Sequence, residues 1–390
     1  MTRDAFTLPD LKDPYFRIKH LSNKEDEDKQ RGLRAILHGK PKSFASVLTR
    51  DLKLLADLKL TTPRTADECR LASLPRGSFF MSFPIKLAGR YLSRDDDVFY
   101  ATENPVRKDK AFKVPLAAAA SWKGNLRWVC LTRLNDWLIG GDEDGEKPDF
   151  KADRENAIEK FVERRVCLWR LFGDEKPEGG ENNEIDTFLD DLPPVEARED
   201  VKKKYWETLR KLCRAEENQH PRHQGRLRFF PTFFDNIDLA VLNPHSRATR
   251  VNANLVTLEC APRGAKGRFA LLYIAPQHAG NGDKEARREE IAADMAEVGK
   301  AIRDMLRVYG FSAKKSSGFG TVFETLPRPE GDESGRKEDL SEYQPAFVVK
   351  PIDEGELIDH FAKKGTSKWK VGDVAEKIAA AANALKEGKL

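Results

Sequence analysis

The chain has 390 residues, of which 39% are hydrophobic and 34% charged, and this balance predicts a packed core under a densely charged surface. The formal net charge is only +4, so bulk charge alone does not mark the chain as a nucleic-acid binder. No apolar run reaches the ~18 residues that a membrane-spanning helix needs, and the N-terminal residues lack the apolar stretch of a signal peptide. We therefore expect a cytoplasmic protein with no membrane partner.

The cysteines exclude two further classes of protein. There are 5 of them, an odd number, and none forms a CxxC pair. This pattern argues against a disulfide framework and against a zinc site, and it predicts reduced, mostly buried thiols. The positions concerned are Cys69, Cys130, Cys167, Cys213 and Cys260.

The first part of the chain predicts helices, one strand and then a long helix. Residues 1–75 are expected to form a helical extension, because apolar residues recur at helical spacing between Ala45 and Leu58. A strand rich in Phe and Ile follows from Phe79 to Leu87. After a polar segment, a helix is predicted to begin near Ser121 and to continue towards Ile139.

An insertion of about residues 140–222 is predicted next. It opens with a loop of glycine and acidic residues closed by Pro148, and helices are expected over 153–171 and 202–217. Between them, the acidic stretch 174–200 predicts an exposed segment. The stretch 103–127, in contrast, is basic. The basic and the acidic stretch together suggest a surface that faces a polyanion, with the acidic segment kept away from it.

The last part predicts a strand pair, a helix and more strands. Two β-rich segments, 254–260 and 268–275, are joined by a hairpin-like connection. A helix with apolar residues every three or four positions runs from Ile291 to Tyr309, and Gly310 ends it. Strands are expected over 319–324 and 346–349, and a helix over 371–387. The order of elements predicts an α+β fold on a βαββαβ plan, with a core over 76–350 and a C-terminal helical tail over 351–390.

A glycine-rich stretch, Ser312 to Val322, is the first motif with a chemical logic. Gly318 and Gly320 would let backbone amides approach a ligand, and Lys314 and Lys315 would supply positive charge for a phosphate. It is not a P-loop, because the GxxxxGK[ST] spacing is missing. An ordinary tight turn between helix and strand explains the same residues equally well.

The second motif lies at the predicted helix start. Serine, lysine, glycine and arginine in Ser121-Trp122-Lys123-Gly124-Asn125-Leu126-Arg127 suit a phosphodiester backbone, and an Asn-Pro segment with Arg107 precedes them. Trp122 could stack on a base or could belong to the core. The alternative for the basic residues is a solvated helix face.

Together these segments resemble the RAMP superfamily of CRISPR-associated proteins. Its members carry a Pro-Gly-Ser-Ser-hydrophobic-Lys-Gly-x-hydrophobic-Arg motif, preceded by an Asn-Pro-hydrophobic-x-Arg segment, and a glycine-rich loop after a long helix. Here alanines replace the Gly-Ser after Pro115, whereas the rest of both motifs is kept. A Leu-Phe-Gly and Gly-Arg-Leu pair, at 171–173 and 225–227, and Asn243-Pro244-His245 look like pieces of type III effector subunits. The resemblance covers about Phe79 to Val322.

The resemblance implies an RRM-like, ferredoxin-like core that binds the guide RNA of a multi-subunit type III-like CRISPR effector complex, as a backbone or a capping subunit in antiviral defence. The implied partners are guide RNA, target RNA and other effector subunits. The residues expected to contact RNA are Arg107, Ser121, Trp122, Lys123, Arg127, Lys314, Lys315, Ser316, Ser317, Gly318, Phe319 and Gly320.

The resemblance also raises the question of catalysis. Backbone subunits of these complexes cleave target RNA with an aspartate before the Asn-Pro-like segment, where this chain has Glu103 and, just upstream, Asp95, Asp96 and Asp97. Such an endoribonuclease would need a carboxylate and would commonly use Mg²⁺ or another divalent cation. The alternatives are a purely structural capping subunit, in which these acids form a solvated turn, and a stand-alone guide-processing ribonuclease. The last would use His220 and His223 as acid and base.

Overall fold

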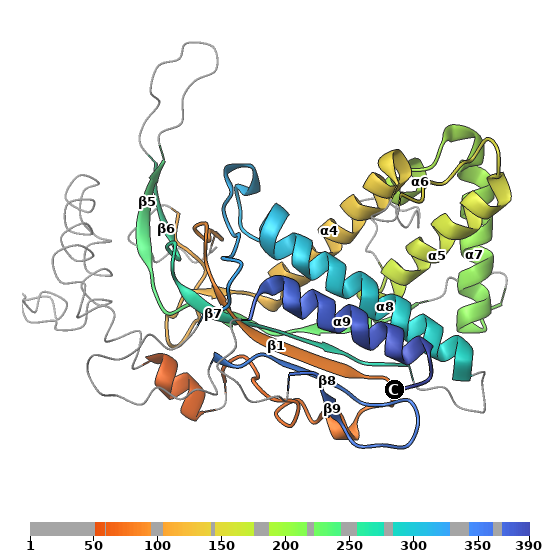
Figure 1. The fold of residues 1–390 in the computed structure, drawn as a ribbon. Coiled ribbons are helices and arrows are strands. Elements are labelled where there is room, and N and C mark those ends of the chain that lie inside the picture. Colours follow the sequence, from red (N-terminus) through yellow and green to blue (C-terminus); the bar gives the residue numbers. More distant parts are fainter. Residues whose placement is uncertain are drawn as a thin grey trace, which may run out of the picture.

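The computed structural model describes residues 51–58, 60–94, 104–141, 145–174, 187–216, 222–242, 256–276, 284–327, 343–361 and 369–390. These residues form a mixed α+β fold around a five-stranded antiparallel sheet of order β3-β7-β1-β8-β9 (Figure 1). The strands are β1 (Phe79–Lys86), β3 (Leu227–Phe229), β7 (Lys266–Tyr273), β8 (Ala346–Val349) and β9 (Ile358–Asp359). The predicted α+β class is confirmed.

The sheet is buried on both faces, and its side chains alternate between two cores. Along β1, Phe79, Met81, Phe83 and Ile85 face the larger core, whereas Phe80 faces the smaller one. The neighbouring strands keep the same period of two, which fixes the register of β1 against β7 and β8.

Three long helices cover the face with the larger core (Figure 1). They are α4 (Ala119–Gly140), α8 (Lys284–Asp304) and α9 (Val371–Lys386). Each matches a helix that the sequence predicts. Helix α9 packs closely on α8, since a Cβ at Gly299 would lie 2.8 Å from a side-chain carbon of Ile378. None of the helices in the described ranges is long and apolar enough to cross a membrane.

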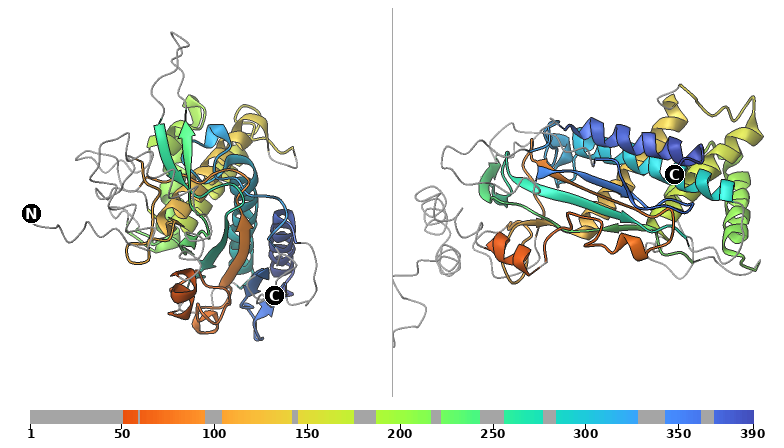
Figure 2. Two further views of the ribbon diagram at one scale, coloured as in Figure 1. Left: turned by 90° about the vertical axis from the view of Figure 1, so that its left-hand side faces the viewer. Right: turned by 60° about the horizontal axis from the view of Figure 1, so that its bottom comes forward.

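Residues 60–75, with the short 3₁₀ helix η1 (Leu71–Ser73), cover the opposite face of the sheet (Figure 2). Leu71 is fully buried against Phe80 and its neighbours. Two hydroxyls hold this segment in place: Thr62 Oγ1 donates to the carbonyl of Pro231 at 2.6 Å, and Ser82 Oγ donates to that of Pro63 at 2.7 Å. A stretch predicted as a separate extension therefore closes one side of the core.

Two additions lie at opposite ends of the sheet (Figures 1 and 2). At one end are α5 (Arg154–Phe172), α6 (Thr187–Asp191), the 3₁₀ turn η2 (Val195–Ala197) and α7 (Arg198–Cys213). At the other end is a hairpin of β5 (Asp238–Leu242) and β6 (Val256–Cys260), and β2 (Leu116–Ala117) pairs with β4 (Thr232–Phe233) nearby. Part of the predicted acidic stretch, 175–186, lies outside the described residues.

Two predictions about strands are wrong. The segments 254–260 and 268–275 do not pair with each other, because β6 pairs with β5 and β7 pairs with β1 and β3. The connection between them bonds instead to the chain after β1, where Tyr91 and Ala261 exchange backbone hydrogen bonds. The predicted strand 319–324 is only a single bridge between Leu87 and Val322.

Candidate nucleic-acid interface

The glycine-rich stretch forms a compact loop directly after α8. The helix passes into a π-helical turn, η3 (Met305–Tyr309), and ends at Gly310, whose φ of 75° is left-handed. A 3₁₀ turn, η4 (Lys315–Ser317), forms the tip. At Gly320, φ is 77° and a Cβ would clash with the backbone nitrogen of Ser312, so only glycine fits there. The lysines and serines at 314–317 therefore project from a rigidly closed loop.

The chain that follows β1 holds the base of this loop. The Ala313 amide donates to the carbonyl of Leu92 at 3.0 Å, and the Gly320 amide donates to that of Arg90 at 2.8 Å. The hydroxyl of Ser312, which is buried, accepts from the Leu92 amide at 2.7 Å. These hydrogen bonds lie at the base of the loop. The residues at its tip are exposed, namely Lys314, Ser316, Ser317 and Gly318.

The start of α4 lies against the same loop. The side-chain amide of Asn125 donates to the carbonyl of Phe311 at 3.1 Å, a contact between residues 186 positions apart in the chain. The indole of Trp128, one turn further along, lies under the ammonium of Lys315 at 4.2 Å from the ring centroid. The two motifs singled out in the sequence thus form one surface.

Helix geometry shows how α4 presents this surface. With 3.6 residues per turn, Ser121, Asn125 and Trp128 share one row that faces the loop. Lys123 and Arg127 form a second row, and Gly124 lies between the two rows. Gly124 is exposed and has no heavy atom within 4 Å of where a Cβ would be, so the helix backbone is open to a ligand there.

The electrostatics of the surface are those of an anion site. Burial lowers the pKa of Lys123, and the nearby charges of Arg127 and of Arg228 on β3 lower it further. Burial also lowers the pKa of Lys315. Within the described part of the chain, Lys123 and Lys314 form no ion pair, and the first turn of α4 carries no acidic residue. The positive charges that gather around Lys123 favour a bound polyanion.

Arg107 lies on the chain that pairs with the segment of Tyr91 and Ser93. Its backbone amide donates to the carbonyl of Ser93 at 2.9 Å, and Arg107 is exposed. The pKa of the buried Tyr91 is raised by burial, and its hydroxyl bonds Ser93 and Ser121. Tyr91 therefore links Ser93 to Ser121 at the start of α4.

Some of the expected contacts are not available. Trp122 is 1% exposed and its indole donates to Thr232 Oγ1 at 3.0 Å, so it belongs to the core and cannot stack on a base. Gly320 is buried, and Phe319 packs against the hydrophobic cluster of the β5–β6 hairpin. In the basic stretch 103–127, Lys108 is buried and paired with Glu259. Sequence reasoning missed Trp128 and Arg228, although Trp128 shares the row of Ser121 at helical spacing.

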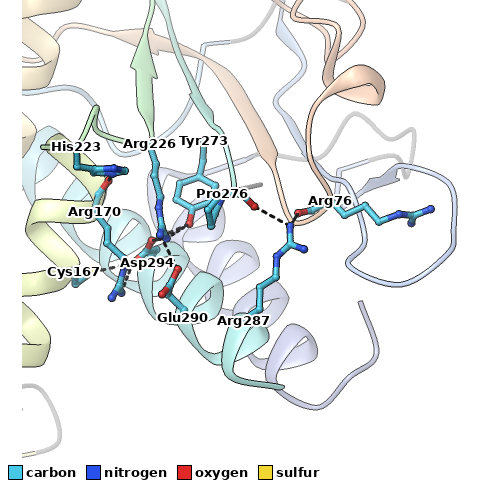
Figure 3. A network of polar contacts seen from close by, with 10 residues as sticks. All are labelled: Arg76, Cys167, Arg170, His223, Arg226, Tyr273, Pro276, Arg287, Glu290 and Asp294. Carbon is cyan, nitrogen blue, oxygen red and sulfur yellow. Dashed lines mark hydrogen bonds and ion pairs between the residues drawn. The ribbon is translucent and has the colours of Figure 1, made fainter. Parts of the chain in front are cut away.

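The Leu-Phe-Gly and Gly-Arg-Leu pair helps to build a buried polar network (Figure 3). Gly173 and Gly225 cross so closely that a Cβ on either would clash with the other segment's backbone. This crossing directs Arg226 to Asp294, which is fully buried, at 2.8 Å. Arg170 and Tyr273 also donate to Asp294, at 2.6 and 2.8 Å. The motif therefore ties α5, β3 and β7 to α8.

Of the proposed histidine pair, the structure describes only His223, whose ring is held by the fold. The ring Nε2 of His223 lies 3.1 Å from the carbonyl of Arg170, and the His223 amide donates to Asp174 at 2.8 Å. Burial lowers the pKa of His223. Its ring is thus engaged by the fold, and the nearby Arg226 is taken up by the buried network. His220 lies outside the described residues.

The candidate catalytic carboxylates Asp95, Asp96, Asp97 and Glu103 all lie outside the described residues, as do Asn243, Pro244 and His245. The flanking chain is described: Arg94 bridges to Val106, and the Glu259 amide donates to the carbonyl of Asn104 at 3.0 Å. Among the residues that the structure describes, no group of three or more His, Cys, Asp or Glu side chains is placed to hold a metal. Cleavage and its divalent cation stay predictions.

Comparison with known proteins adds little to this geometry. No protein-family model matches the chain, and no curated protein is similar to it in sequence. One solved structure with which the chain aligns is a cryo-EM structure of the Type III-B Cmr-beta bound to cognate target RNA. The alignment has a TM-score of 0.38 and 12% identity, and it covers 77% of this chain and 74% of the other.

Proposed function

We propose that this chain is a guide-RNA-binding subunit of a type III-like CRISPR effector complex. The observation that carries the proposal is the convergence of the start of α4 and the glycine-rich loop on one cationic surface. Asn125, in the motif of α4, bonds the carbonyl of Phe311, which directly precedes the glycine-rich stretch, and both motifs resemble those of the RAMP superfamily. An ordinary turn would explain the loop alone, but it does not explain why the loop lies against the start of α4, with Lys315 over the ring of Trp128.

The topology supports an RRM-like, ferredoxin-like core. The elements β1, α4, β3, β7, α8 and β8 follow one another in the order βαββαβ, with α5–α7 and the β5–β6 hairpin as insertions. In the sheet these strands have the order β3-β7-β1-β8, so the first strand lies between the third and the fourth. Residues 60–75 cover the face opposite the helices, which leaves the loop and the start of α4 as the RNA-binding edge.

The proposed surface recognises the RNA backbone more than the bases. Lysine and arginine side chains, hydroxyls and an open helix backbone are partners for phosphates and ribose, and such contacts position an RNA without reading its sequence. This suits a guide, because base pairing between guide and target carries the sequence information in RNA-guided complexes. The helical insertion α5–α7 lies at the far end of the sheet from this surface (Figure 1).

A charge-removal experiment tests the proposal. Replacing Lys123, Arg127, Lys314 and Lys315 by Ala lowers the formal net charge by 4, from +4 to 0. A control that replaces Lys147, Lys151, Lys203 and Lys211, all exposed on the helical insertion and its approach, makes the same change in charge. For single-stranded RNA, each phosphate contact makes the plot of log K against log salt steeper by about 0.7. Because the site variant lacks four cationic side chains, its slope should be shallower than that of wild type by about 3. The control should keep the wild-type slope. Equal affinity and slope in both variants would overturn the proposal.

A further inference from the structure

The row of α4 that faces the glycine-rich loop ends in an exposed tryptophan. Trp128 is 43% exposed, whereas Trp122 and Trp137 are buried in the core. Its indole lies next to Arg127 in the chain and under the ammonium of Lys315. The ring of Tyr309, at the end of the π-helical turn, meets it edge to face with centroids 5.2 Å apart. The fold of the described residues does not require an indole at this surface position.

The surroundings of Trp128 suit a nucleobase. Tyr309 is fixed behind it, because its hydroxyl donates to Asp136 at 3.3 Å. Among the described residues, the contact given for the Lys315 ammonium is the one with this ring, and burial already disfavours its charge. A phosphate would draw this ammonium away, and the ring face that it covers would then be free. An aromatic face beside phosphate-binding cations is the arrangement by which proteins hold single-stranded RNA.

We propose that Trp128, backed by Tyr309, stacks on one unpaired base of the RNA whose backbone lies along Lys123, Arg127 and Lys314. This inference rests on the proposed function and adds to it a contact with a base. Because every base has an aromatic face, the site is tolerant of sequence and requires only that the base is not paired. The chain would therefore favour a single-stranded segment of the guide over a duplex at this point.

The test compares two oligomers with the full-length chain: a short single-stranded RNA and an abasic ribose-phosphate oligomer of equal length. Trp128→Ala should bind the RNA about 5- to 150-fold more weakly than wild type, the range measured for a stacked base. On the abasic oligomer it should equal wild type. The salt dependence should not change, because no phosphate contact is lost. Trp128→Phe should restore most of the affinity.

Ile139→Ala is the matched control, since it also removes an exposed apolar side chain from α4, about 16 Å along the helix axis. It should bind both oligomers as wild type does. The stacking site is overturned if Trp128→Ala leaves RNA binding unchanged, if it weakens both oligomers equally, or if it instead impairs association with another protein subunit. Should the wild-type chain bind neither oligomer, the proposed function fails and the stacking site fails with it.

Discussion

Gly124 offers a perturbation in which stability and RNA binding should move in opposite directions. It lies in the interior of α4, is exposed, and has no heavy atom within 4 Å of where a Cβ would be. Gly124→Ala therefore creates no clash and should stabilise the fold by about 1 kcal/mol, the difference in helix propensity between the two residues. A simple loss of folding cannot then explain weaker binding.

The same methyl group should hinder RNA. It would project between the rows of Lys123 and Trp128, where we expect a phosphate to approach the helix backbone. Holding that phosphate away should weaken RNA binding about tenfold, or ~1.4 kcal/mol. Fluorescence anisotropy with labelled single-stranded RNA measures the affinity, and urea unfolding measures the stability.

Gly140 provides the control, because it is the last residue of the same helix and also has open space at its Cβ position. It lies about 24 Å from Gly124 along the helix axis. Gly140→Ala should leave RNA affinity unchanged. If Gly124→Ala is more stable and binds RNA as tightly as wild type, RNA does not approach the backbone of α4, and the reasoning about this surface is wrong.

Three further predictions concern the core, the charge and the chemistry. Asp294→Ala should lower the free energy of unfolding by about 3–5 kcal/mol, because it leaves the buried Arg170 without its carboxylate and Arg226 with Glu290 alone; Tyr273→Phe should cost only about 1 kcal/mol in the same urea titration. RNA affinity should fall as pH rises, because binding needs the charged forms of Lys123 and Lys315. The fall should begin below the pH at which ordinary lysines lose their charge, because the pKa values of both lysines are lowered. An affinity that stays constant with pH up to the usual lysine range would contradict this prediction. Each of Asp95, Asp96, Asp97 and Glu103 would be replaced by Ala in the assembled complex. One of these changes should abolish divalent-dependent cleavage of a matched target RNA at the position that this subunit covers. If all four single variants cleave normally, the subunit does not supply the carboxylate.

The sequence predicts the elements that have a clear local pattern, and it misses those that depend on pairing with distant segments of the chain. Helix α8 follows from its apolar spacing, α9 from its run of alanines, and β1 from its run of Phe and Ile. Strand β3 is three residues long, and only Leu227 in it is buried, so it leaves no pattern to read. The expected pairing of 254–260 with 268–275 is wrong because β6 pairs with β5. Local composition does not indicate which of these segments pair with each other.

The candidate site shows the same division. The composition of each motif indicates phosphate chemistry, but neither motif indicates that Asn125 meets Phe311, since that contact depends on how α4 and α8 pack on the sheet. The position of Trp122 could have been predicted, because Leu126 and Val129 share its helix face and are also buried. The position of Arg228 could not have been predicted, because only the packing of β3 beside α4 brings Arg228 near Lys123.

Crosslinking is the most direct test of the central claim. The chain would be purified with its native complex, irradiated to crosslink protein to RNA, and both the attached peptides and the attached RNA would be sequenced. We predict crosslinks in the peptides that contain Ser121–Trp128 and Lys314–Phe319, attached to a guide RNA with CRISPR-repeat sequence. Crosslinks confined to other parts of the chain, or RNA without any repeat sequence, would contradict the claim that this surface binds guide RNA.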